Sequence, residues 1–206
     1  SNDVHICGVA GDQQASLFGQ RCFKKGQYKT TYGTGAFVLT NVGNKVVYSK
    51  NKLLTTIAWK IGKEITYCLE GSVFICGGLF SWLKHDLKLI DNESQAQKLA
   101  AQVKDSNGVY IVPAFIGLGA PYWDNEAKGS IVGIGIGTNR KHILRAAIES
   151  MAYQVKDVVE TLRKDTKLDN KEMRVDGGVC HNEILLQFQS DMLRSKIKLP
   201  KSEETT

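Results

Sequence analysis

The sequence contains no long apolar run and no leader segment. Its apolar runs stay well short of the roughly 18 residues that a membrane-spanning helix needs, and no charged-then-apolar stretch opens the chain. These two absences predict a soluble, cytoplasmic protein without a membrane partner.

Paired metal-ligating residues are also missing. The 5 cysteines are odd in number and form no CxxC pair, and the 4 histidines form no HxxxH or HExxH pair. This spacing argues against a transition-metal site of the finger or helical type, and any metal is expected to bind oxygen ligands. Reduced, mostly buried thiols are the favoured state of the cysteines.

The positive charge is spread thinly along the chain. The formal net charge is +6 and the pI is about 9.0, but basic residues form nothing longer than pairs such as Lys24-Lys25 and Arg140-Lys141. This distribution predicts a solvated surface and no nucleic-acid partner. A mild positive field would also suit an anionic substrate such as a nucleotide.

The order of predicted elements indicates an α/β fold with a mixed sheet and flanking helices. With 206 residues, of which 42% are hydrophobic, the chain can bury one large core or two small ones. Hydrophobic periodicity predicts strands at 4–10, 28–32, 36–42, 54–60, 65–70, 108–113, 172–176 and 196–199, and helices at 13–19, 73–90, 94–103, 140–163 and 182–193.

The longest predicted helix, 140–163, carries one apolar stripe that we expect to be buried. Its members are Leu144, Ala147, Met151, Val155, Val158 and Leu162. After the last predicted strand the chain ends at 203–206 without a helix to cover that side of the sheet. We therefore expect a truncated domain.

Three turns combine glycine with a polar residue at the end of a predicted strand, at 11–13, 33–35 and 176–178. Glycine lets the backbone approach an anion closely, so that successive N–H groups point at phosphate oxygens. Most such turns simply reverse the chain, and each one alone is weak evidence. No GxxxxGK[ST] P-loop and no GxGxxG opening a helix is present.

Asp12 has the chemistry of a general base. Phosphoryl transfer to an alcohol depends on positioning and on a carboxylate that accepts the hydroxyl proton. Two amide side chains follow Asp12 directly and could bind a polyol. An aspartate at a strand end is more often a cap or a turn residue, so the role needs further support.

Several segments resemble signatures of the FGGY carbohydrate kinases. GDQQASLFGQ at 11–20 resembles a loop of this family in the form found in members that act on glycerol. Further matches, in the family's order, are YGTG at 32–35, PAF at 113–115 with GLGAPYW at 117–123, RVDGG at 174–178 and QFQSD at 187–191. The resemblance covers the chain from about Val4 onward.

The resemblance implies a ribonuclease H-like, actin-like fold, one of two such domains that close over ATP, Mg²⁺ and glycerol. Residues 1–206 would be the nucleotide-binding C-terminal domain that carries the catalytic base. The N-terminal kinase domain, its partner, and the final C-terminal helices would be absent. Whether the full-length enzyme forms a homo-oligomer stays open.

The resemblance also implies roles for individual residues. Asp12 would be the base on the glycerol hydroxyl and lie near Mg²⁺, while Gln13 would bind glycerol and Phe37 would pack against its carbon atoms. The residues implied to bind ATP or ADP are Gly33, Thr34, Gly35, Gly77, Ser81, Gly177, Gly178 and Asn182. Ser81 departs from the family form, in which we expect glutamine.

The implied activity is ATP-dependent phosphorylation of glycerol to glycerol 3-phosphate by the full-length enzyme, with the isolated chain inactive. Two alternatives remain open. The chain could be a catalytically incomplete nucleotide-binding fragment, or it could belong to an FGGY kinase for another polyol or sugar, such as a pentulose or gluconate. The loops of those kinases usually lack the Gln13-Gln14 pair.

Overall fold

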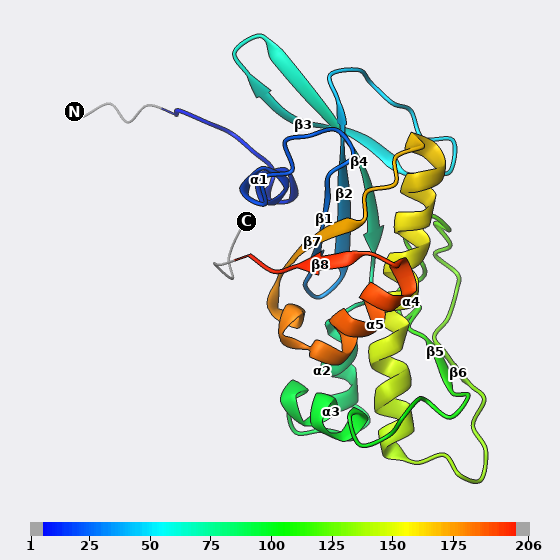
Figure 1. The fold of residues 1–206 in the computed structure, drawn as a ribbon. Coiled ribbons are helices and arrows are strands. Elements are labelled where there is room, and N and C mark those ends of the chain that lie inside the picture. The colour runs from blue at the N-terminus through cyan, green and yellow to red at the C-terminus, as the bar shows by residue number, and fades with distance from the viewer. Residues whose placement is uncertain (1–5, 201–206) are drawn as a thin grey trace.

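A computed structural model describes residues 6–200 (Figure 1). The strands are β1 (Tyr28–Tyr32), β2 (Ala36–Gly43), β3 (Leu54–Ile61), β4 (Glu64–Val73), β5 (Tyr110–Val112), β6 (Ser130–Val132), β7 (Glu172–Asp176) and β8 (Lys196–Lys198). The helices are α1 (Asp12–Gly19), α2 (Gly78–His85), α3 (Glu93–Ala100), α4 (Arg140–Thr166) and α5 (Glu183–Leu193), with a short 3₁₀ helix, η1 (Gly178–His181).

The main sheet is mixed, as the sequence predicts. Its six strands lie in the order β3-β4-β2-β1-β7-β8. The first four pair antiparallel as two consecutive hairpins, whereas β1, β7 and β8 pair parallel. The parallel pairing of β1 with β7 brings the ends of these two strands together, because Thr31 pairs with Asp176. The turns that follow both strands therefore meet at one edge of the molecule.

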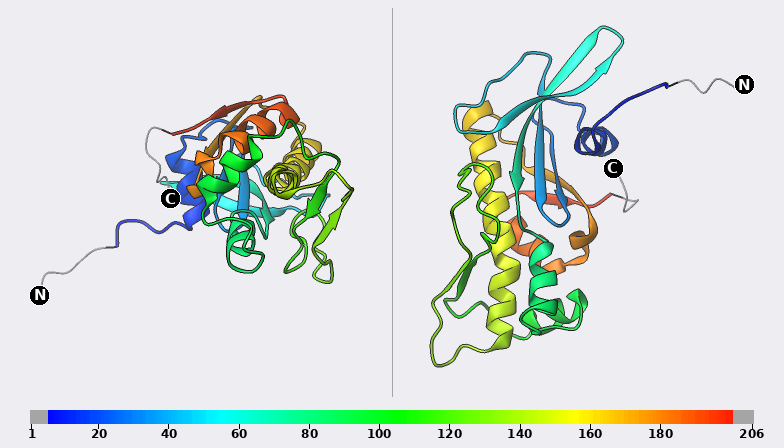
Figure 2. Two further views of the ribbon diagram at one scale, coloured as in Figure 1. Left: turned by 90° about the horizontal axis from the view of Figure 1, so that it is seen from below. Right: turned by 180° about the vertical axis from the view of Figure 1, so that it is seen from behind.

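The two faces of the sheet are covered differently. The large core lies between the sheet and helices α4 and α5, and it includes Val38, Leu69 and Val175. A smaller cluster lies under α1 on the other face, where Leu17 packs with Leu39 and Cys68. Figures 1 and 2 show α1 and α4 on opposite sides of the sheet, with α2 and α3 beyond its lower end.

Local patterns predicted most elements well. The bounds of β1 and β7 agree with the predicted strands, and α4 begins at the predicted residue and extends three residues further. Every member of the predicted stripe on α4 is buried. Asn139 caps this helix, since its side chain accepts a hydrogen bond from the Lys141 amide.

Two predictions were wrong, and two short elements were missed. Residues 6–10 form no strand, because no described strand lies beside them to share backbone hydrogen bonds; Val4 and His5 lie outside the described residues. The helix predicted at 73–90 is only α2, since Val73 still pairs with Ala36 as the last residue of β4. The short exposed strand β6 was missed, as was η1.

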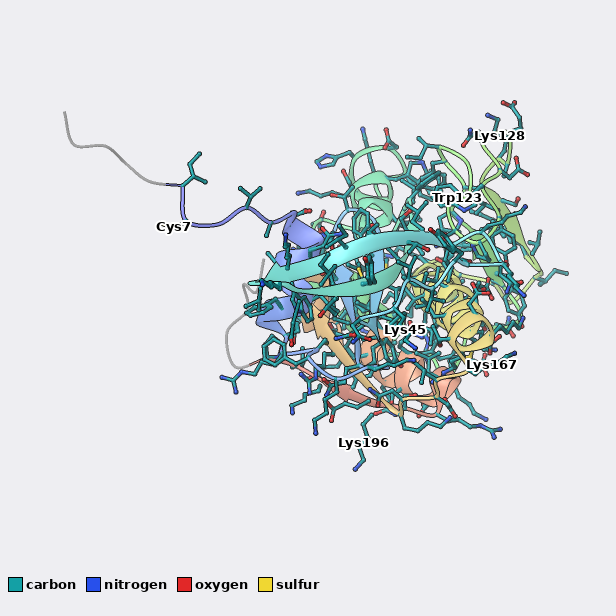
Figure 3. All side chains as sticks on the ribbon, turned by 90° about the horizontal axis from the view of Figure 1, so that it is seen from above. Cys7, Lys45, Trp123, Lys128, Lys167 and Lys196 are labelled. Carbon is teal, nitrogen blue, oxygen red and sulfur yellow. The ribbon has the colours of Figure 1, made fainter. Side chains whose placement is uncertain are left out.

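The described residues contain no helix that is long and apolar enough to cross a membrane. Cys22, Cys68, Cys76 and Cys180 are buried thiols, and Cys7 is exposed. Cys7 lies on the extended segment that leads away from the body of the molecule (Figure 3).

Candidate active site

A cavity of about 700 Å³ opens where the turn after β1 meets the start of α2 and η1. Its volume is in the range of small-molecule and cofactor sites. It is lined by Tyr32, Gly33, Thr34, Gly77, Gly78, Phe80, Ser81, Lys84, His85, Asn92, Glu93, Gly178 and Val179. Two of the three predicted glycine turns therefore face one cavity.

Backbone contacts hold the walls of this cavity together. The amides of Cys76 and Gly78 both donate to the Thr34 carbonyl, at 2.8 and 3.0 Å, and the Gly77 amide donates to the Gly33 carbonyl at 2.9 Å. A Cβ atom on Gly77 would lie 2.7 Å from that same carbonyl oxygen. The turn at 33–34 can approach the start of α2 this closely only because glycine is present.

Five of the eight residues predicted to bind nucleotide line the cavity directly: Gly33, Thr34, Gly77, Ser81 and Gly178. Asn182 lines an adjoining cavity of about 320 Å³ that shares Gly178 and Val179 with the first. The Asn182 side chain also caps α5 by accepting from the Leu185 amide at 3.1 Å.

The other two residues predicted to bind nucleotide, Gly35 and Gly177, do not line the cavity but pack against the backbone next to it. Gly177 has φ of 92°, and a Cβ atom there would lie 2.4 Å from the Tyr32 carbonyl oxygen. A Cβ atom on Gly35 would lie at the same distance from the Val73 carbonyl oxygen. Both positions need glycine for packing of backbone against backbone.

Asp12 lies apart from the cavity lining, as the first residue of α1. Its side chain is exposed, whereas Gln13 is buried. Gln13 holds both carboxylate oxygens: its backbone amide donates to Oδ1 at 2.8 Å and its Nε2 donates to Oδ2 at 3.3 Å. The carboxylate is thus oriented and open to solvent, as a base that meets its substrate must be.

Phe37 lies on the same face of the sheet as α1. It is half-buried against the small cluster of Leu17, Leu39 and Cys68. The structure therefore places Asp12, Gln13 and Phe37 on one side of the sheet.

A buried polar network lies under α1. The Nζ of Lys29, which is fully buried on β1, donates to Gln13 Oε1 at 2.5 Å and to Thr31 Oγ1 at 2.6 Å. On β7, Asp176 Oδ2 accepts from Ser16 Oγ at 2.6 Å and from Gln20 Nε2 at 3.2 Å. Side chains from one helix and two strands thus meet in a single cluster.

The charges of this network perturb each other. Burial lowers the pKa of Lys29 to about 8, although the carboxylates of Asp176, Glu70 and Asp12 oppose the shift. Burial also raises the pKa of Glu70, which the Lys29 charge counteracts. Perturbed pairs of this kind are common at functional sites, although structural networks produce them too.

Lys29, Glu70 and Asp176 were not predicted as members of the site. Lys29 lies in the strand sequence YKTTY, where it shares one face with the polar Thr31 opposite Tyr28 and Tyr32, a pattern that indicates a solvent-facing side chain. The sequence holds no local signal that α1 covers this face. The position of Asp176 next to the predicted Gly177-Gly178 turn was the one available hint.

The chain matches known proteins over most of its length. Residues 28–206 match the FGGY family of carbohydrate kinases, C-terminal domain. A glycerol kinase of Oceanobacillus iheyensis is 51% identical over 204 residues, which is 99% of this chain but 41% of that relative. The family match starts after Asp12 and Gln13, whereas the alignment with this relative leaves out only two residues of the chain.

Solved structures agree with this assignment. The crystal structure of Plasmodium falciparum glycerol kinase with ADP has a TM-score of 0.90 and 42% identity, covering 97% of this chain and 40% of that one. A ligand-bound xylulose kinase from Lactobacillus acidophilus has a TM-score of 0.83 at 22% identity, covers 95% of this chain and 39% of that one, and supports the fold alone. The fold is the ribonuclease H-like, actin-like one. The chain therefore belongs to the FGGY family of carbohydrate kinases, as a C-terminal domain of that family.

Proposed function

We propose that this chain supplies the nucleotide site and the catalytic base of an ATP-dependent glycerol kinase. The chain spans about two fifths of the length of the curated relatives that it matches, so the activity is that of the whole protein. The observation that carries the proposal is the exposed Asp12 carboxylate held by Gln13, on a helix that packs beside the strands whose ends form the cavity.

The cavity suits ATP or ADP. The backbone of the glycine turns at 33–35 and 177–178 can come close to phosphate oxygens, and Gly77 lies just before the N-terminus of α2. Ser81, one helical turn after Gly77, would contact the adenosine together with Gly178 and Asn182.

Mg²⁺ fits only as an ion shared with the nucleotide. The described residues contain no group of three or more histidine, cysteine or carboxylate side chains that could hold a metal by themselves. Mg²⁺ is commonly held by one or two carboxylates and by substrate phosphates, and the exposed Asp12 supplies one such carboxylate. When bound, ATP supplies the transferable phosphoryl group and Mg²⁺ neutralises charge on its phosphates.

The chain's own residues then act on the acceptor. Gln13 would hydrogen-bond glycerol, Phe37 would pack against its carbon atoms, and Asp12 would accept the proton of the attacking hydroxyl as the new P–O bond forms. The product is glycerol 3-phosphate. The missing share of the relatives' length would supply the remaining contacts as a partner domain.

The test replaces Asp12 in the full-length protein. Asp12→Asn keeps the size of the side chain and its contact with the Gln13 amide but removes the base, so kcat for glycerol should fall on the order of 10²- to 10⁴-fold. ADP affinity, measured by calorimetry without Mg²⁺, should stay within about twofold, because Asp12 lies outside the cavity. A near wild-type rate would show that another group is the base.

Two further assays separate the alternatives. A phosphorylation screen over polyols, pentuloses and gluconate should give glycerol the highest kcat/KM; preference for a sugar would move the chain to another member of the family. The isolated 206-residue chain should bind ADP without turnover. Robust activity from this chain alone would contradict the two-domain arrangement.

A further inference from the structure

One face of α1 is polar and buried, which is unusual for a helix that packs on a sheet. Gln13 and Ser16 of α1 and Gln20, its C-cap residue, lie at helical spacing, and all three are at most 9% exposed. They meet Lys29 of β1 and Asp176 of β7 rather than an apolar surface. Burial of this many polar groups calls for a role beyond simple packing.

Lys29 determines which way the Gln13 amide points. A lysine ammonium has donors and no acceptor, so the atom of Gln13 that faces Nζ at 2.5 Å must be the carbonyl oxygen Oε1. The amide nitrogen then faces the other way, where Nε2 lies 3.3 Å from Asp12 Oδ2. A flipped amide would place its N–H groups against the lysine and its oxygen against the carboxylate, and both contacts would be repulsive.

We propose that Lys29 is a positioning residue that acts through Gln13: by holding Oε1, it turns the Gln13 NH₂ group toward Asp12 and the acceptor alcohol. The proposal rests on the proposed function, because the acceptor is taken to be glycerol. Lys29 itself touches no substrate in this arrangement. Thr31, the second acceptor of Nζ at 2.6 Å, fixes the direction of the lysine side chain.

The test measures glycerol kinetics of the full-length protein with Lys29→Met, which keeps the length of the side chain and removes the donor. KM for glycerol should rise on the order of tenfold, because Gln13 no longer presents its NH₂ group to the alcohol and that hydrogen bond is lost, while KM for ATP stays within about twofold. The control is Lys45→Met, an exposed lysine on a loop (Figure 3), which should leave both constants unchanged.

A double-mutant cycle distinguishes positioning from a structural role. In a Gln13→Ala background, Lys29→Met should change KM for glycerol by less than about twofold, because the group that it positions is gone. If Lys29→Met raises KM equally with and without Gln13, or raises KM for both substrates equally, the proposal is wrong.

A neutron-diffraction structure of the unaltered protein gives an answer even if Lys29→Met does not fold. The amide deuterons of Gln13 should point toward Asp12 and its carbonyl toward Lys29; the reverse orientation overturns the inference. Glycerol phosphorylation by the unaltered protein tests the proposed function separately from the role of Lys29. Absence of glycerol phosphorylation by the unaltered protein would refute the proposed function, while the amide orientation would still be decided by diffraction.

Discussion

Asp176 and Gly177 are consecutive residues at the end of β7, yet their surroundings differ in kind. Asp176 is 2% exposed and accepts hydrogen bonds from the side chains of Ser16 in α1 and of Gln20 directly after it. Gly177 has a positive φ and lies against the Tyr32 carbonyl, and the next residue, Gly178, lines the cavity. The proposed acceptor side, around Asp12 and Gln13, thus rests on buried side chains, whereas the proposed nucleotide side, around Gly33 and Gly178, is built from closely packed backbone.

This difference separates two ways of making a site. Backbone that approaches backbone through glycine fixes the shape of a cavity without burying charge, so it is sensitive to the size of a substituent. A buried network of charged and polar side chains is sensitive to the loss of one partner, because the remaining groups are left without water. Substitutions at Asp176 and at Gly177 should therefore destabilise the protein for different physical reasons.

The largest effect is expected from Asp176→Ala, which breaks the acceptor side. It removes the acceptor of Ser16 and Gln20 and the carboxylate that most favours the charged form of Lys29, so the free energy of unfolding should fall by about 3 kcal/mol. Urea-induced unfolding measures the change. The control Asp191→Ala removes an exposed aspartate and should cost less than about 0.5 kcal/mol; equal costs would mean that the network contributes nothing.

A smaller loss is expected from Gly177→Ala on the nucleotide side. A Cβ atom there would meet backbone at 2.4 Å and would hold φ near 92°, so the free energy of unfolding should fall by about 2 kcal/mol. The neighbouring Gly178→Ala is a matched control, because its Cβ atom would have no neighbour within 4 Å. If both variants unfold at the same urea concentration, close backbone packing is not what requires glycine at 177.

Elements were predictable where the signal was local. The alternation in β7 and the 3.6-residue period in α4 depend on each segment's own residues, and both were predicted nearly to the residue. The strand predicted at 4–10 failed because a strand also needs a neighbour, which the pattern does not contain. The predicted start of the helix at Val73 was wrong for a related reason. The pairing of Val73 with Ala36 extends β4 into the segment predicted as helix.

The same distinction holds for the site. Glycine turns were predicted at the cavity because the residue type itself signals close approach of backbone, and Gly33 and Gly178 do line it. Lys29 was missed because its burial depends on α1, which lies elsewhere in the sequence and covers that face of the sheet. Side-chain networks between distant elements are therefore the part that single-sequence reasoning does not reach.

The smallest effect is expected from a longer side chain at position 81. It would add a side-chain contact to the proposed nucleotide cavity, whose shape depends mainly on closely packed backbone. Ser81 is exposed and lines the cavity one helical turn after Gly77, at a position where the family resemblance implies glutamine. Ser81→Gln should tighten ADP binding about two- to tenfold, because one further amide hydrogen bond contributes about 1 kcal/mol. KM for glycerol should not change, since the residues proposed to bind the acceptor, Asp12, Gln13 and Phe37, do not line this cavity.

Calorimetric titration with ADP measures this change, and Ser81→Met is its matched control. Methionine has nearly the length of glutamine without its amide, so tighter binding with glutamine alone assigns the gain to a hydrogen bond. Equally tighter binding with both variants would assign the gain in affinity to apolar contact with the adenine ring of ADP. Weaker binding with glutamine would mean that Lys84 and His85, which line the same cavity, already occupy the space that the longer side chain needs.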